Sequence, residues 1–156
     1  MTGDKTTEAM KFPVHSGPPP RSGKTTLERE IPSDVALVTL LVIRVVDFLE
    51  QETCIAPKDR NQIALCIEEA LLNAVCHGNK KDFKKKVRLS AYRAEKEWGL
   101  LVSDEGDGFD PNRIQDPLGE DGIWSESGRG LYLMSHYMDR IEFYNGGRTI
   151  VMARHL

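Results

Sequence analysis

The sequence predicts an α/β (α+β) two-layer sandwich, in which a mixed and mainly antiparallel sheet carries its helices on one face. Three observations support this. Two long apolar helical patterns stand before two alternating segments, residues 87–93 and 98–103. A third helical pattern follows at 131–138. The chain then ends in a hairpin pattern around Gly146-Gly147.

The bulk composition indicates one ordinary domain. The 156 residues suffice for a core, and the net charge of -3 gives no reason to expect direct nucleic-acid binding. The three cysteines have no metal-type spacing and fit a reducing cytosol. The apolar run 35–43 is too short to cross a membrane, and the polar N-terminus is unlike a secretory signal. We therefore expect a cytoplasmic protein with no membrane segment.

Residues 1–26 are rich in Thr, Gly, Pro, Ser and Lys, which predicts a flexible N-terminal tail before a domain at 27–156. Gly23-Lys24-Thr25 resembles the end of a phosphate-binding P-loop, but its spacing from Gly17 is wrong and no apolar strand precedes it. We exclude a P-loop.

Residues 27–31 alternate as a short edge strand, and Pro32-Ser33-Asp34 then predicts a helix start with Ser33 as the N-cap. This helix, to about Glu52, is apolar on nearly all sides. One face of this helix would pack on the sheet. The remaining apolar surface would be covered by the next helix or by a second subunit.

The organising segment is the helix predicted at residues 61–79. Glu69, Asn73 and His77 form a narrow polar stripe on an otherwise mostly apolar helix. Unpaired buried polar groups cost on the order of 1–3 kcal/mol each, so the stripe is either an internal hydrogen-bond network or a ligand site. The basic run 80–88 that follows is typical of a solvated loop and strand edge, although a bound polyanion would be attracted to it.

The strand at 98–103 continues into a loop that holds Asp104, Gly106 and Gly108. The glycines permit close approach of a ligand, and Asp104 presents a fixed carboxylate. A calcium loop is excluded, because glycines occupy ligand positions, and Pro111 breaks a Rossmann fingerprint.

Residues 111–127 lack apolar periodicity and predict a mobile lid. Gly128-Arg129-Gly130 then opens the third helix, whose N-terminal amides favour an anion. The polar stripe, the Asp-Gly loop and this turn would converge on one ligand.

These motifs resemble those of the GHKL superfamily of ATP-binding domains, which includes gyrase, heat-shock chaperone, histidine kinase and mismatch-repair ATPases and has the Bergerat-type, histidine-kinase-like ATPase fold. Glu69, Asn73 and His77 match its N box, Asp104-x-Gly106-x-Gly108 its first glycine box and Gly128-Arg129-Gly130 its second. The closing segment 138–156 is most similar to bacterial serine-protein kinases that act as anti-sigma factors, of the RsbW and SpoIIAB type.

The resemblance implies ATP and Mg²⁺ as cofactors. By its residue matches, Glu69 is the general base, Asn73 binds Mg²⁺, and Asp104 recognises the adenine amino group beside Gly106 and Gly108. Gly128, Arg129 and Gly130 border the triphosphate, and His77 lies nearby, where it contacts either phosphate or a residue that binds it.

The resemblance also implies a serine/threonine kinase that phosphorylates a STAS-domain anti-anti-sigma protein and sequesters a sigma factor, as a homodimer. Two alternatives stay open: a related switch kinase acting on a STAS scaffold, and a non-catalytic module that binds ATP and sequesters its partner. A histidine kinase is disfavoured, since the only upstream histidine, His15, lies in the proline-flanked tail.

Overall fold

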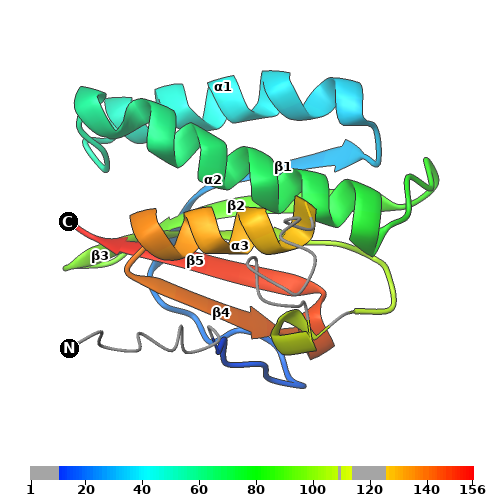
Figure 1. Cartoon of the computed structure of the whole chain (residues 1–156). Helices are drawn as coiled ribbons and strands as arrows, with labels where there is room; N and C mark the ends of the chain where they lie inside the picture. Colours follow the sequence, from blue (N-terminus) through cyan, green and yellow to red (C-terminus); the bar gives the residue numbers. More distant parts are fainter. Residues whose placement is uncertain (1–10, 109, 114–125) are drawn as a thin grey trace, which may run out of the picture.

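The computed structural model describes residues 11–108, 110–113 and 126–156. A five-stranded sheet of order β1-β2-β3-β5-β4 carries α1, α2 and α3 on one face (Figure 1). The strands are β1 Lys24–Pro32, β2 Lys86–Arg93, β3 Glu97–Ser103, β4 Arg140–Tyr144 and β5 Thr149–His155. The helices are α1 Val35–Gln51, α2 Arg60–Leu72 and α3 Glu126–Tyr137. The predicted sandwich is confirmed, with all four strand pairings antiparallel.

The core forms between the helices and one face of the sheet. Because side chains alternate along a strand, Leu89 of β2 and Leu100 of β3 point to the helices and are fully buried. Val45 of α1 and Ile67 of α2 meet them from above and are equally buried. None of the described helices is long and apolar enough to span a bilayer.

The start of α1 differs from its prediction. Asp34, rather than Ser33, is the N-cap, since its carboxylate accepts a hydrogen bond from the Ala36 amide at 2.9 Å. The Ser33 hydroxyl is buried instead, donating to the Lys85 carbonyl at 2.6 Å and accepting from the Asn79 carboxamide at 2.8 Å. A buried hydroxyl with two tertiary partners is not available as a cap.

The organising helix changes geometry where its polar stripe lies. After α2 the chain continues as a π-helical turn, Asn73–Gly78, and the Asn79 amide donates to the Ala74 carbonyl at 2.8 Å. Asn79 then accepts from the Glu105 amide at 2.8 Å. Such π-helical turns are rare and frequent at functional sites. Here the turn fixes the end of α2 to the Asp-Gly loop.

The described part of the predicted tail, residues 11–26, makes contacts with the rest of the domain. Phe12 is buried in the core, Val14 pairs in parallel with Phe143 of β4, and β1 begins at Lys24. Composition predicted flexibility because polar and proline-rich residues dominate, but an unpaired strand edge offers backbone hydrogen bonds to any sequence. Residues 1–10 lie outside the described residues.

The predicted lid falls mostly on residues 114–125, which also lie outside the described residues. Its first residues form a short 3-10 turn, Pro111–Arg113. Helix α3 begins at Glu126, so Gly128, Arg129 and Gly130 lie inside the helix and not in a turn before it.

Candidate functional site

Two hollows meet at the end of α2, and Asn73 lines both. The first, the Asp104 pocket, has a volume of about 20 Å³. It is lined by Ala70, Asn73, Ala74, Val102, Asp104, Phe143, Gly147, Arg148 and Ile150. The second, the Glu69 pocket, has a volume of about 380 Å³. Its lining residues are Val35, Glu69, Leu72, Asn73, Cys76, His77, Lys81 and Arg129.

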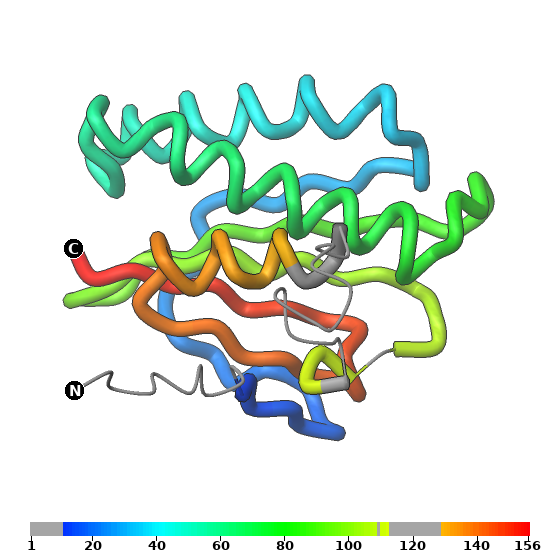
Figure 2. The backbone as a smooth tube through the Cα atoms, in the orientation of Figure 1, coloured from blue at the N-terminus to red at the C-terminus, as the bar shows by residue number. Residues whose placement is uncertain are grey.

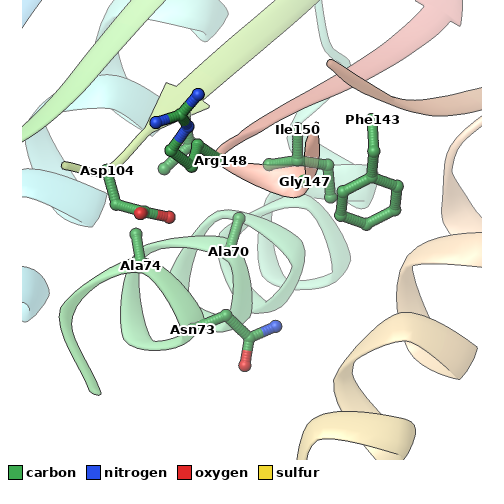
Figure 3. Close-up of a pocket in the computed structure, with 9 residues that line it drawn as sticks. Ala70, Asn73, Ala74, Asp104, Phe143, Gly147, Arg148 and Ile150 are labelled. Carbon is green, nitrogen blue, oxygen red and sulfur yellow. The ribbon is translucent and has the colours of Figure 1, made fainter. Parts of the chain in front are cut away.

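Asp104 supplies the fixed carboxylate of the first pocket. Figure 3 shows it facing Ala74, with Arg148 beside it and the Asn73 carboxamide directed away. Its Oδ1 accepts a hydrogen bond from the Gly106 amide at 2.8 Å, and its own amide donates to the Arg148 carbonyl at 2.9 Å. Burial raises the pKa of Asp104, while the Gly106 amide and Arg148 oppose that rise. An acceptor between apolar walls suits a flat heterocycle that carries an amino group.

The glycines around Asp104 make room for the protein's own backbone. A Cβ at Gly106 would stand 2.0 Å from the Gly78 carbonyl oxygen, and one at Gly78 would stand 2.4 Å from the Asp104 carboxylate. Gly108 has a φ of +82°, and a Cβ there would meet the Gly146 carbonyl oxygen at 2.3 Å. From the sequence we predicted that Gly106 and Gly108 leave room for a ligand to approach the backbone. In the structure the close neighbours are the end of α2 and the β4–β5 turn.

Glu69 faces α3 across the second pocket. A Cβ at Gly130 would stand 2.5 Å from the Glu69 carboxylate oxygen, so a side chain at this position of α3 would displace the Glu69 carboxylate. Arg129 and Lys81 line the same hollow, as does His77. Cationic side chains around one carboxylate suit phosphate groups next to a hydroxyl that donates to that carboxylate.

The basic run divides into two parts. Lys86 and Arg88 pair with Glu30 of β1 at 3.4 and 3.0 Å, as expected of a solvated strand edge. Lys81, in contrast, lines the Glu69 pocket, and its φ of +57° is unusual for a residue with a side chain. Part of the run therefore belongs to the site.

The structure brings Glu69, Asn73, His77 and Arg129 to one hollow and joins it, through Asn73, to Asp104. Gly106, Gly108 and Gly130 support the walls, and Gly128 lies in the first turn of α3. Sequence reasoning missed five residues that shape the site: Gly78, Asn79, Phe143, Gly147 and Arg148. Of these residues, Phe143 could have been predicted, because alternation along its strand places its side chain on the face of the sheet that the helices cover.

The donor set fits a magnesium nucleotide better than a resident metal ion. The described residues contain no group of three or more His, Cys, Asp or Glu side chains that could hold a metal. Mg²⁺ is usually bound by one or two protein oxygens together with substrate phosphates, and the Asn73 carboxamide between the two pockets can supply such an oxygen. The Asp104 pocket has room for roughly one water molecule, so a heterocycle enters only if its walls separate.

Comparison with known proteins agrees with this geometry. RsbW, a serine-protein kinase of Bacillus subtilis, is 35% identical to the chain over 102 residues, which cover 60% of this chain and 63% of that protein. RsbW of Bacillus velezensis is 33% identical over 106 residues, covering 63% and 66%. The anti-sigma F factor of Clostridium perfringens is 31% identical over 102 residues, covering 62% and 73%.

The chain spans slightly less than two thirds of the length of these RsbW relatives. A wider match comes from the family described as the histidine kinase-like ATPase domain, which covers residues 31–154. The match includes all three boxes, the residues that line both pockets, the whole of β2, β3 and β4, the end of β1 and all of β5 except His155. The chain therefore belongs to the histidine kinase-like ATPase (GHKL) family, with RsbW kinases and an anti-sigma F factor among its distant relatives.

Proposed function

We propose that the protein is a Mg-ATP-dependent serine/threonine protein kinase that acts as an anti-sigma factor in the cytoplasm. The observation that carries the proposal is that Asn73 lines both pockets, with Asp104 in one and Glu69 in the other. Adenine, metal and transferred phosphate would then lie in that order along the end of α2. Asp104 accepts a hydrogen bond from the adenine amino group, and Asn73 supplies an oxygen to Mg²⁺.

Glu69 is the general base in this proposal. Its carboxylate takes the proton of an acceptor hydroxyl as that oxygen bonds to the γ-phosphorus and the bond to the β-phosphate oxygen breaks. Arg129 and Lys81 offset the charge that develops on the phosphoryl oxygens, and His77 contacts phosphate. Mg²⁺, when bound with ATP, neutralises phosphate charge.

The proposed substrate is a STAS-domain anti-anti-sigma protein, and the proposed second partner is an RNA polymerase sigma factor. Support comes from relatives named serine-protein kinase and anti-sigma F factor. A phosphate on the acceptor adds about -1.5 to -2 charges, which would separate the two proteins and free the kinase to hold a sigma factor. Leu40 and Ile43 leave about half of their surface exposed on α1, so this face is the one we assign to a homodimer.

The test is transfer of labelled γ-phosphate from Mg-ATP to STAS-domain proteins of the same source, with Glu69→Gln beside the wild type. We expect label on a serine or threonine, with transfer by the variant slowed by roughly 100-fold or more while nucleotide still binds. Full activity of Glu69→Gln would contradict the assignment of the base.

Tight ATP binding without transfer to any STAS protein would favour the sequestering module. Transfer to a STAS scaffold, without competition by any sigma factor, would favour the related switch kinase. Gel filtration with light scattering of wild type and Leu40→Asp tests the dimer, which the charge on α1 should dissociate.

A further inference from the structure

Residues 12–17, which we call the strap, extend the sheet beyond its β4 edge. The His15 amide donates to the Phe143 carbonyl, and the Phe143 amide donates to the Pro13 carbonyl, each at 2.9 Å. In Figure 2 the blue trace runs beside β4 before it continues to β1 at the opposite edge of the sheet. The strap lies outside the family match at 31–154, so nothing in the three boxes accounts for it.

The strap also holds the turn between β4 and β5. The Asn145 amide donates to the Gly17 carbonyl at 2.8 Å, and the Gly146 amide donates to the His15 carbonyl at 3.0 Å. This turn leads directly to Gly147 and Arg148, which line the Asp104 pocket. Its Gly146 carbonyl is also the group that stands against Gly108. The strap is therefore one layer behind the pocket wall.

Phe12 reaches the same wall from the core side. Its ring lies edge-on to Phe143, with centroids 5.9 Å apart and planes at 75°, and Phe143 lines the Asp104 pocket. The Asn112 side chain makes two hydrogen bonds to the Phe12 backbone, a pair that we call the clasp. Its Oδ1 accepts from the Phe12 amide at 2.7 Å, and its Nδ2 donates to the Phe12 carbonyl at 2.9 Å. The clasp ties the strap to the chain that leaves the Asp-Gly loop.

We propose that the strap, through Phe12 and its clasp with Asn112, is a positioning element of the nucleotide site. It holds in place the sheet-side wall of the Asp104 pocket, where the Asp104 amide is hydrogen-bonded to the Arg148 carbonyl of the β4–β5 turn. The opposite wall is the end of α2 with Ala70 and Ala74 (Figure 3). The base enters only if the two walls separate. A sheet-side wall that stays ordered while they separate loses less entropy on binding than one that must itself become ordered, which raises affinity. This inference rests on the proposed nucleotide site and adds to it residues that precede the family match.

The test uses the full chain with Asn112→Ala, Asn112→Asp and the control Leu49→Ala. Asn112 is exposed, so its truncation leaves the core intact. Leu49 is buried in α1, 14 residues beyond the Val35 that lines the Glu69 pocket, so Leu49→Ala measures the effect of general destabilisation. The readouts are the Kd and KM for Mg-ATP, kcat, and hydrogen exchange of the Gly146 amide.

We expect Asn112→Ala to raise Kd and KM by about tenfold, because two hydrogen bonds are lost, and to leave kcat unchanged, because Glu69 and Asn73 are untouched. Asn112→Asp keeps the acceptor for the Phe12 amide and should recover part of the affinity. Gly146 should exchange faster in Asn112→Ala, and Leu49→Ala should lower thermal stability without changing Kd.

If the wild type binds nucleotide and Asn112→Ala binds it with the same Kd, the strap inference alone would be overturned. The strap would then serve only to cover the β4 edge of the sheet. Equal losses of affinity in Asn112→Ala and Leu49→Ala would overturn it as well. Failure of the wild type to bind any nucleotide would overturn the proposed function and the inference together.

Discussion

Two polar clusters lie on opposite faces of the same sheet, and they are built from similar residue types. On the helix side are Glu69, Arg129, Lys81 and Asn73 of the Glu69 pocket. On the other face, alternation along β2, β3 and β4 places a second set, which we call the Tyr92 cluster. Its members are Tyr92, Glu97, Arg140, Glu142 and Tyr144.

The polar groups of the Tyr92 cluster bond to one another. The Tyr92 hydroxyl donates to Glu97 at 2.8 Å, and Arg140 donates to the same carboxylate at 2.6 Å and to the hydroxyl at 3.0 Å. Burial alone would raise the pKa of Glu97, but Tyr92 and Arg140 together hold it below its usual value. Burial and Glu97 raise the pKa of Tyr92 to about 12, so its hydroxyl stays protonated.

The Glu69 pocket differs in that its charged groups surround a hollow of about 380 Å³. A carboxylate beside an arginine is therefore no sign of function by itself. The distinction is whether the polar groups fill the space between them or enclose space for another molecule. Substitutions on the two faces should consequently separate binding from stability.

The largest effect is expected for Asn73→Ala, which removes the one side chain that, among the described residues, lines both pockets. Affinity for ATP in Mg²⁺ should fall on the order of 100-fold, because the metal loses a protein ligand. Affinity in EDTA should change far less. Calorimetric titration with and without Mg²⁺ measures both, and an unchanged Kd in Mg²⁺ would count against the metal role.

Asp104→Asn should weaken nucleotide binding by about tenfold, since a charge-assisted hydrogen bond becomes a neutral one. The same change should make the free protein more stable at pH 7. Burial raises the pKa of Asp104 above its ordinary 3.8, so the wild type loses stability as pH rises through that elevated value.

The stability difference between Asp104→Asn and wild type should therefore disappear below about pH 3.8. Thermal unfolding between pH 3 and pH 8, without nucleotide, measures it. A variant less stable than the wild type at pH 7 would show that Asp104 supports the fold and not the ligand.

The smallest effect is expected for Tyr92→Phe, which removes the hydroxyl that donates to Glu97 and accepts from Arg140. The free energy of unfolding should fall by about 1 kcal/mol at pH 7, with no change in nucleotide affinity. Tyr92 helps to hold the pKa of Glu97 down, and a lowered carboxyl pKa stabilises the fold above the unfolded pKa and ceases to do so as pH falls.

The deficit of Tyr92→Phe should therefore shrink on acidification, which urea unfolding at several pH values can follow. An altered nucleotide Kd in this variant would mean that the two faces of the sheet are coupled, and the comparison between them would no longer hold.

Much of the site was predictable because its residues are close in sequence. Glu69, Asn73 and His77 repeat at the spacing of a helix face, and all three line the Glu69 pocket. The pocket residue Arg148 and the support from Gly78 were not predictable, because each acts on Asp104 across a tertiary contact. The contacts of the strap were not predictable for a related reason: its partner, the β4 edge, is about 130 residues away in the chain.

The sequence by itself determined the elements, the sandwich and the polar stripe, since these follow from hydrophobic period and local turn chemistry. Only the tertiary structure decided which polar groups enclose a hollow and which satisfy one another. It also decided that Phe12 packs behind the Asp104 pocket through Phe143. Contacts of this kind depend on strand order and on the approach of distant backbones, which no local pattern encodes.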